Sequence, residues 1–139
     1  MISHEDLRSL AAEWGIADHI AEKNYVIGWV LWGIGQDNDV GHKWVFKGGT
    51  CLKKCYLETY RFSEDLDFTV REPLVKKKDY PFYAEGRIYY QGPRNTPTPA
   101  SIKIDLLSSE KIVHVPVLNK IAHGFPDDLP AGAKIMCYS

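Results

Sequence analysis

Cysteine is scarce in this sequence of 139 residues: there are three, and no two of them form a C-x-x-C pair. Small secreted domains that depend on disulfides carry many more. The cysteine content therefore argues against a disulfide scaffold and predicts a protein of the reducing cytoplasm. The first residues, MISHED, have neither the basic nor the apolar segment of a signal peptide, so none is expected.

A long hydrophobic run is also missing. The most apolar segment, residues 25–34 with the sequence YVIGWVLWGI, is shorter than the roughly 20 residues that a membrane-spanning helix needs. It predicts a buried core helix, and no membrane partner is expected.

Charge of one sign is not in excess, because 17 Lys and Arg face 18 Asp and Glu and the net charge is −1. Such a balance gives no general attraction to nucleic acid or to membranes. An RNA partner would need a local basic patch. The lysine run at residues 76–78 fits either a solvated loop or a contact with an RNA backbone.

Hydrophobic residues make up 45% of the chain and charged residues 25%, which is typical of a globular protein. We expect one domain over residues 1–139, of α/β (α+β) class, with a small mixed sheet flanked by helices. Apolar periodicity and turn signals predict helices from Ser3 to about Gly15 and over 17–35, and strands over 44–46, 65–70, 101–107, 111–118 and 134–138. Residues 82–91 read as two short strands with a bulge or turn at Gly86.

Residues 44–70, WVFKGGTCLKKCYLETYRFSEDLDFTV, carry the pattern on which the functional interpretation depends. A short strand ends at Gly48 and Gly49, and apolar residues then recur at helical spacing from Cys51 to Tyr60. A glycine turn that opens a helix leaves backbone N–H groups free at the positive end of the helix dipole, where phosphate binds well. The turn therefore predicts a phosphate site.

Two acids follow on the next strand. Asp65 and Asp67 are two positions apart, so both point to one face with Cα atoms roughly 7 Å apart. Two carboxylates at about 5 Å repel by roughly 3 kcal/mol at an effective dielectric of 20, unless a proton or a cation lies between them. Oxygen ligands favour Mg²⁺ or Mn²⁺. A phosphate site beside such a metal site is suited to nucleotide chemistry.

A third acid, Asp105, lies on the predicted strand 101–107, on the same face as Ser101 and Lys103. An unpaired charge on a half-buried strand is costly. From spacing alone, Asp105 is either neutralised by a nearby basic side chain or is a third carboxylate at the metal face.

The segments FKGGT (46–50) and YRFSEDLD (60–67) together resemble the AbiEii/AbiGii toxin family. The resemblance implies a nucleotidyltransferase-type fold and Mg²⁺-dependent transfer of a nucleoside monophosphate from an NTP to an RNA or protein hydroxyl, with release of pyrophosphate. It also implies a toxin of a type IV toxin–antitoxin or phage-defence system, with an antitoxin as partner. It favours the metal-face interpretation of Asp105, because family members carry a third acid on a strand of this type.

The resemblance further implies a set of site residues. The catalytic and metal-binding residues would be Asp65, Asp67 and Asp105. The nucleotide-binding residues would be Lys47, Gly48, Gly49, Thr50, Arg61 and Ser63. For three of them a structural role is the alternative: Ser63 as a turn cap, Arg61 in an ion pair with a surface acid, and Lys47 lying along its strand with its head in water.

Family members usually continue into a helical half that supplies a lysine and further acids, and no such half is expected here. The alternative to an active enzyme is thus a catalytically inactive, truncated remnant that binds a nucleotide or a partner. A metal-dependent phosphohydrolase or nuclease is a third possibility, since it also uses clustered acids. Cys51 and Cys55, four apart on the predicted helix, fit buried apolar positions better than a soft-metal site.

Overall fold

The computed structural model describes residues 1–56, 62, 64–71, 83–108, 114–130 and 132–138. The helical elements are α1 (His4–Trp14), α2 (Asp18–Gln36), α3 (Gly48–Cys51) and a π-helical turn η1 (Leu52–Tyr56). The strands are β1 (Trp44–Lys47), β2 (Leu66–Val70), β3 (Tyr83–Tyr90), β4 (Ala100–Leu107), β5 (Val117–Lys120) and β6 (Lys134–Cys137).

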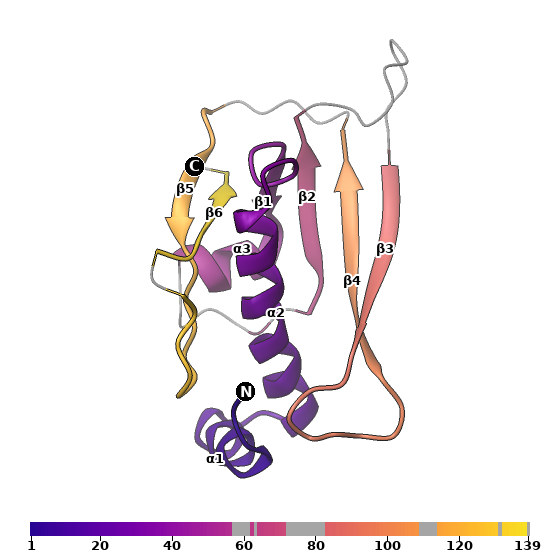
Figure 1. Cartoon of the computed structure of the whole chain (residues 1–139), viewed down its shortest axis with the longest axis vertical. Helices are drawn as coiled ribbons and strands as arrows, with labels where there is room; N and C mark the ends of the chain where they lie inside the picture. The colour runs from indigo at the N-terminus through magenta and orange to yellow at the C-terminus, as the bar shows by residue number, and fades with distance from the viewer. Residues whose placement is uncertain (57–61, 63, 72–82, 109–113, 131, 139) are drawn as a thin grey trace.

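The strands form one sheet in the order β3-β4-β2-β1-β6-β5. The pairs β2–β4 and β1–β6 are parallel, and the other three neighbouring pairs are antiparallel. The predicted fold class, a small mixed sheet with helices, is therefore confirmed (Figure 1).

The ends of α1 follow the predicted signals. The Ser3 side chain accepts a hydrogen bond from the Asp6 backbone N–H at 3.0 Å, which satisfies one of the free donors of the first turn. Gly15 ends the helix with a φ of 68°, a left-handed conformation that glycine adopts without a side-chain clash.

Two strand predictions need correction. Residues 83–90 form one continuous strand rather than two, because Gly86 has an extended backbone and stays in register opposite Ile104. The strand predicted over 111–118 instead begins at Val117, directly after Pro116, and 111–113 lie outside the described residues. Proline has no N–H to donate to a ladder. This agrees with the position of β5, which ends the sheet.

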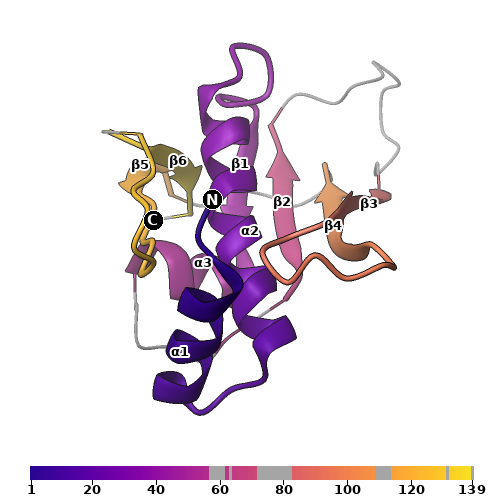
Figure 2. The same ribbon diagram turned by 60° about the horizontal axis from the view of Figure 1, so that its bottom comes forward.

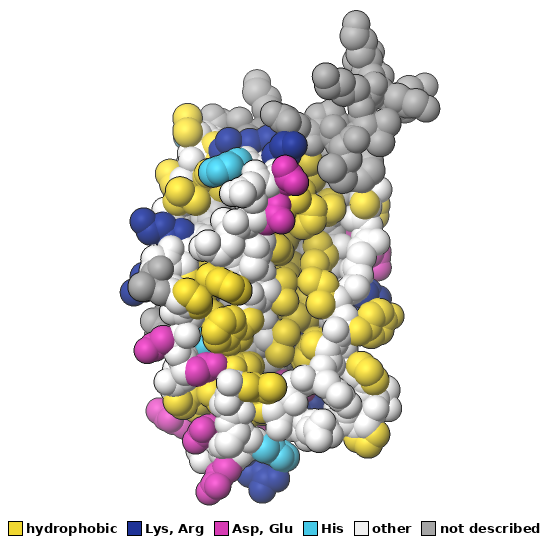
Figure 3. Space-filling model, in the orientation of Figure 1, with side chains coloured by type: hydrophobic (Ala, Val, Ile, Leu, Met, Phe, Trp, Pro, Cys, Tyr) yellow, Lys and Arg dark blue, Asp and Glu magenta, His cyan; other side chains and the backbone are white. Residues whose placement is uncertain are grey.

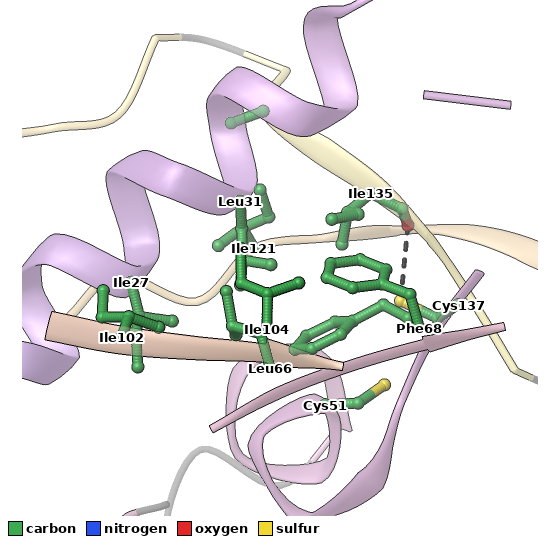
Figure 4. Close-up of a cluster of buried hydrophobic side chains, with 12 residues drawn as sticks. Ile27, Leu31, Cys51, Leu66, Phe68, Ile102, Ile104, Ile121, Ile135 and Cys137 are labelled. Atoms are coloured by element: carbon green, nitrogen blue, oxygen red, sulfur yellow. Dashed lines mark hydrogen bonds between the residues drawn. The ribbon is translucent and has the colours of Figure 1, made fainter. Parts of the chain in front are cut away.

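The main core lies between α2 and one face of the sheet (Figure 4). Ile27 and Leu31 of α2 are fully buried together with Phe46 of β1 and with Leu66 and Phe68 of β2. In Figure 1, α2 lies in front of β1 and runs nearly along the strands, and in Figure 3 hydrophobic side chains form a band alongside it. Because side chains alternate along a strand, Asp67, which lies between Leu66 and Phe68, points to the opposite face of the sheet.

A second cluster holds α1 against the start of α2. Figures 1 and 2 both show the two elements side by side. Leu7 and Ala11 of α1 are buried with Ala21 and Tyr25 of α2 and with Phe125. No helix in the described part of the chain is long and apolar enough to cross a membrane.

Phe68 is the side chain whose loss tests this core most directly. It is fully buried, and its ring centroid lies 5.2 Å from that of Phe46 and 5.5 Å from that of Trp44. We expect Phe68→Ala to lower the free energy of unfolding by about 3–5 kcal/mol, through lost burial and an unfilled cavity. Urea denaturation measures the change.

The control is Val115→Ala, at a side chain that is 82% exposed, which should change the unfolding free energy by less than about 0.5 kcal/mol. Equal losses in the two variants would contradict the assignment of Phe68 to the core.

Candidate active site

The parallel pairing of β2 with β4 brings two of the predicted acids together. Asp67 and Asp105 are register partners in adjacent strands. Asp67 lies between the buried Leu66 and Phe68, so its carboxylate points away from the α2 face of the sheet. The sheet therefore places both carboxylates side by side on its other face.

The surroundings of Asp67 raise its pKa. Partial burial makes the largest contribution, the negative charge of Asp105 the next, and Asp65 adds to both. Lys47, the register partner of Asp67 on β1, opposes the shift with its positive charge. Asp65 itself is exposed, just before β2 begins. The charges of Asp65 and Asp105 thus both act on Asp67.

Asp105 has partners of its own. The Tyr83 hydroxyl donates a hydrogen bond to Asp105 Oδ1 at 2.8 Å, and Lys103 Nζ lies 3.5 Å from Asp105 Oδ2. The bond to Asp105 raises the pKa of Tyr83 to about 12. The first interpretation, pairing with a basic side chain, is therefore seen in Lys103. Asp105 also lies opposite Asp67, and its role as a third carboxylate at a metal face stays a prediction.

Tyr83 is a site residue that the sequence did not reveal, and so is Glu85. Glu85 is opposite Asp105 in the β3–β4 register, and its carboxylate lies 3.8 Å from Lys103 Nζ. A one-residue change of register would move both side chains to the other face of the sheet. Only the strand register could have identified them.

The glycine turn touches the acids directly. Gly48 has a φ of 85°, and a Cβ atom at this position would lie 2.9 Å from Asp67 Oδ2. A side chain here is therefore strained by the backbone conformation, and it would also force the Asp67 carboxylate to shift. Gly48 and Gly49 begin α3, as the sequence predicted for a turn that opens a helix.

Thr50, which the resemblance places at the nucleotide, has its hydroxyl bonded to the protein backbone. Its side chain is buried, and its hydroxyl donates a hydrogen bond to the backbone carbonyl of Asp65 at 2.5 Å. The hydroxyl therefore fixes α3 to the start of β2 and so holds the glycine turn beside Asp65.

The donor set fits a hard divalent cation. Three carboxylates offer oxygen ligands, which suit Mg²⁺ and Mn²⁺. Burial is the main cause of the raised pKa of Asp67, and the negative charge of Asp105, the second cause, is charge that a cation would neutralise. The aspartates are not as tightly grouped as Cys51, Cys55 and Cys137, whose sulfurs form the compact group of potential ligands in the described residues.

Arg61 and Ser63, which the sequence placed at the nucleotide, lie outside the described residues, as does the lysine run 76–78. Of the predicted site residues, the structure brings together Lys47, Gly48, Asp67 and Asp105, with Thr50 and Asp65 at the edge of the group.

Replacing Asp67 should stabilise the protein at neutral pH. A carboxyl with a raised folded-state pKa binds more protons in the folded state, so its contribution to stability falls as pH rises above the ordinary value of 3.8. We expect Asp67→Asn to have a higher unfolding free energy than wild type at neutral pH, with the gain shrinking as pH falls through the folded pKa. Denaturant titrations at several pH values measure this.

The matched control is Asp39→Asn, which removes an exposed loop carboxylate far along the chain from the cluster. A stability gain of the same size and pH dependence in the control would mean that the Asp67 result reflects net charge rather than this cluster.

A second prediction concerns the turn. Gly48→Ala should cost about 1–2 kcal/mol for the left-handed backbone, plus a further cost for the contact with Asp67. Gly132→Ala is the comparison, because Gly132 has a φ of 78° and nothing within 4 Å of an added Cβ. We expect the extra cost in Gly48→Ala to disappear in the double variant with Asp67→Ala. Equal costs in both glycine variants would contradict the close approach.

Comparisons with known proteins bear on the family and the fold. Residues 29–87 match the family model described as nucleotidyl transferase AbiEii toxin, type IV TA system. Among curated proteins, no match to the chain was found. Among solved structures, MenT4, a nucleotidyltransferase toxin from Mycobacterium tuberculosis H37Rv, superposes with a TM-score of 0.70 at 16% sequence identity. The match covers 100% of this chain and 55% of MenT4, so the chain spans about half the length of that toxin. The fold is thus that of a nucleotidyltransferase toxin, and the resemblance to the AbiEii family is confirmed over residues 29–87.

Proposed function

We propose that this protein is a divalent-metal-dependent nucleotidyltransferase that moves a nucleoside monophosphate from an NTP to an acceptor hydroxyl. One observation carries the proposal: Asp67 and Asp105 are paired on adjacent parallel strands while Gly48 packs against the Asp67 carboxylate. Clustered carboxylates beside a glycine turn match what phosphoryl transfer needs, namely a metal site next to a place for phosphates.

Asp65, Asp67 and Asp105 would hold Mg²⁺ or Mn²⁺ through their oxygens. When bound, the ion would neutralise charge on the triphosphate and on the transferring phosphoryl group. The raised pKa of Asp67 supports this assignment, because carboxylates that repel one another gain most from a shared cation.

The other groups would position the substrates. The backbone N–H groups of Gly48 and Gly49, at the start of α3, would bind phosphates beside Asp67, whose carboxylate lies against Gly48. The Lys47 charge acts on the same carboxylate and would offset charge on the phosphates. Most of the rate gain would come from holding the acceptor in line with the phosphoryl group.

Asp105 is suited to accept the proton of the acceptor hydroxyl. Tyr83 and Lys103 fix its two carboxylate oxygens in place, at 2.8 and 3.5 Å. These contacts would orient Asp105 as a base, and proton transfer would further require the acceptor hydroxyl within hydrogen-bond reach of its carboxylate.

The family match and MenT4 support a role as a toxin, and the name of the family model includes a type IV toxin–antitoxin system. We therefore propose an antitoxin protein as partner and an RNA or protein hydroxyl as acceptor. A role in phage defence and a cytoplasmic location belong to the same proposal.

The second candidate is a catalytically inactive form that binds a nucleotide or a partner. The two candidates differ in turnover and agree on NTP binding.

The deciding experiment incubates the purified protein with Mg²⁺, each of four α-labelled NTPs, and total cellular RNA and protein. We expect label to move onto a macromolecule, and the transfer to fall at least about a hundredfold in Asp65→Asn and in Asp67→Asn, as for loss of a charge-stabilising group in an active site. Asp39→Asn, an exposed loop variant, should keep wild-type transfer.

The products separate the candidates. Mg²⁺-dependent NTP binding without transfer would favour the inactive form. Free phosphate or cleaved nucleic acid would mean that water is the acceptor, as in a phosphohydrolase or nuclease. If the folded protein shows neither NTP binding nor transfer, that result would contradict the assignment of the glycine turn as a phosphate site.

A further inference from the structure

The three cysteines of the chain meet at one point of the fold, although Cys137 is far from Cys51 and Cys55 in the sequence. Cys51 ends α3, Cys55 lies in η1 and Cys137 ends β6, beside Phe46 in the β1–β6 pairing. All three are free thiols, and their sulfurs lie within 4.8 Å of one another. Figure 4 shows Cys51 and Cys137 among the buried side chains of the core.

The sulfur spacing matches that of a thiolate metal site. Cys137 Sγ lies 3.3 Å from Cys55 Sγ, and the widest sulfur–sulfur separation stays within 4.8 Å. In a tetrahedral site with Zn–S bonds near 2.3 Å, two sulfurs are about 3.8 Å apart. Small rotations of the three side chains would therefore place the sulfurs around one ion, without movement of the backbone.

The thiols of the cluster make few hydrogen bonds that an ion would have to replace. Cys137 Sγ donates to Cys55 Sγ and to the Ile135 carbonyl, each at 3.3 Å. A metal ion binds such a group by displacing the thiol protons.

A buried positive charge adjoins the cluster. The Lys54 side chain is 2% exposed, its Nζ donates a hydrogen bond to the Ala122 carbonyl at 3.3 Å, and its charge acts on Cys55. Three thiolates, one ammonium and one divalent cation together carry no net charge. This balance favours a dication over a monovalent ion such as Cu⁺.

An entry path exists as well. Cys55 and Lys54 line a cavity of about 900 Å³, with Tyr56 and His123 also in its wall. Water from this cavity could fill the fourth position of a zinc ion that has three protein ligands. His123 is not part of the compact ligand group, although its side chain is only 5% exposed.

We propose that Cys51, Cys55 and Cys137 bind one Zn²⁺ ion, with its fourth position open to the cavity beside η1. The ion would join α3 and η1 to strand β6. Because Gly48 begins α3, this link would also hold the glycine turn in place. This site is separate from the aspartates and does not depend on the proposed transfer reaction.

The test uses the whole protein, stripped of metal with a chelator and kept reduced. Native mass spectrometry after addition of Zn²⁺ should show one bound equivalent, and Co²⁺ in its place should give thiolate-to-cobalt charge-transfer absorption. Cys55→Ser, at a half-buried side chain, should lose the absorption and weaken zinc binding at least tenfold while keeping the circular dichroism of wild type.

Two controls assign the ligands. His123→Gln, in the same cavity wall, and Asp67→Asn, at the carboxylate site, should both retain one equivalent of Zn²⁺ and the charge-transfer band. Cys137→Ser is the second thiol variant and should also lose the band. Absence of stoichiometric binding in the wild type, or equal binding in Cys55→Ser, would overturn the proposal, and tight binding of Cu⁺ without Zn²⁺ would overturn the choice of metal.

Discussion

The repulsion between two carboxylates on neighbouring strands is the constraint on which the rest of the site depends. Asp67 and Asp105 are placed side by side by the register of β2 and β4, and partial burial keeps water from screening them fully. Such an arrangement destabilises the fold unless a cation or a proton relieves it. The surrounding groups, Lys47 next to Asp67 and Lys103 with Tyr83 next to Asp105, offset part of the charge.

The core on the opposite face supplies the stability that tolerates this repulsion. Leu66 and Phe68, on either side of Asp67, are fully buried against α2, so β2 cannot slip in register without exposing both. The hydrogen bond from the buried Thr50 to the Asp65 carbonyl then joins α3 to the same strand. One strand thus links the core, the acids and the glycine turn.

Much of this arrangement is predictable from sequence, and the part that is not has a common cause. Local patterns identified the capped helix after Ser3, the long apolar helix α2, the glycine turn at Gly48 and the alternating strand that carries Asp67. Local patterns do not predict contacts between segments that are distant in the sequence. The Tyr83 hydroxyl on Asp105 and the meeting of Cys137 with Cys55 follow from strand register and sheet order, which composition and spacing do not encode. Gly86 was misread because a glycine in an extended strand looks like a turn signal.

The most direct test of this account is to measure the pKa of the Asp67 carboxyl by ¹³C NMR across a pH titration. The account predicts a value above the ordinary 3.8 in the wild type, a lower one in Asp105→Asn, and a fall when Mg²⁺ is added to the wild type. An ordinary pKa that neither Asp105→Asn nor Mg²⁺ changes would contradict it, because the carboxylates would then form neither a repelling pair nor a metal site.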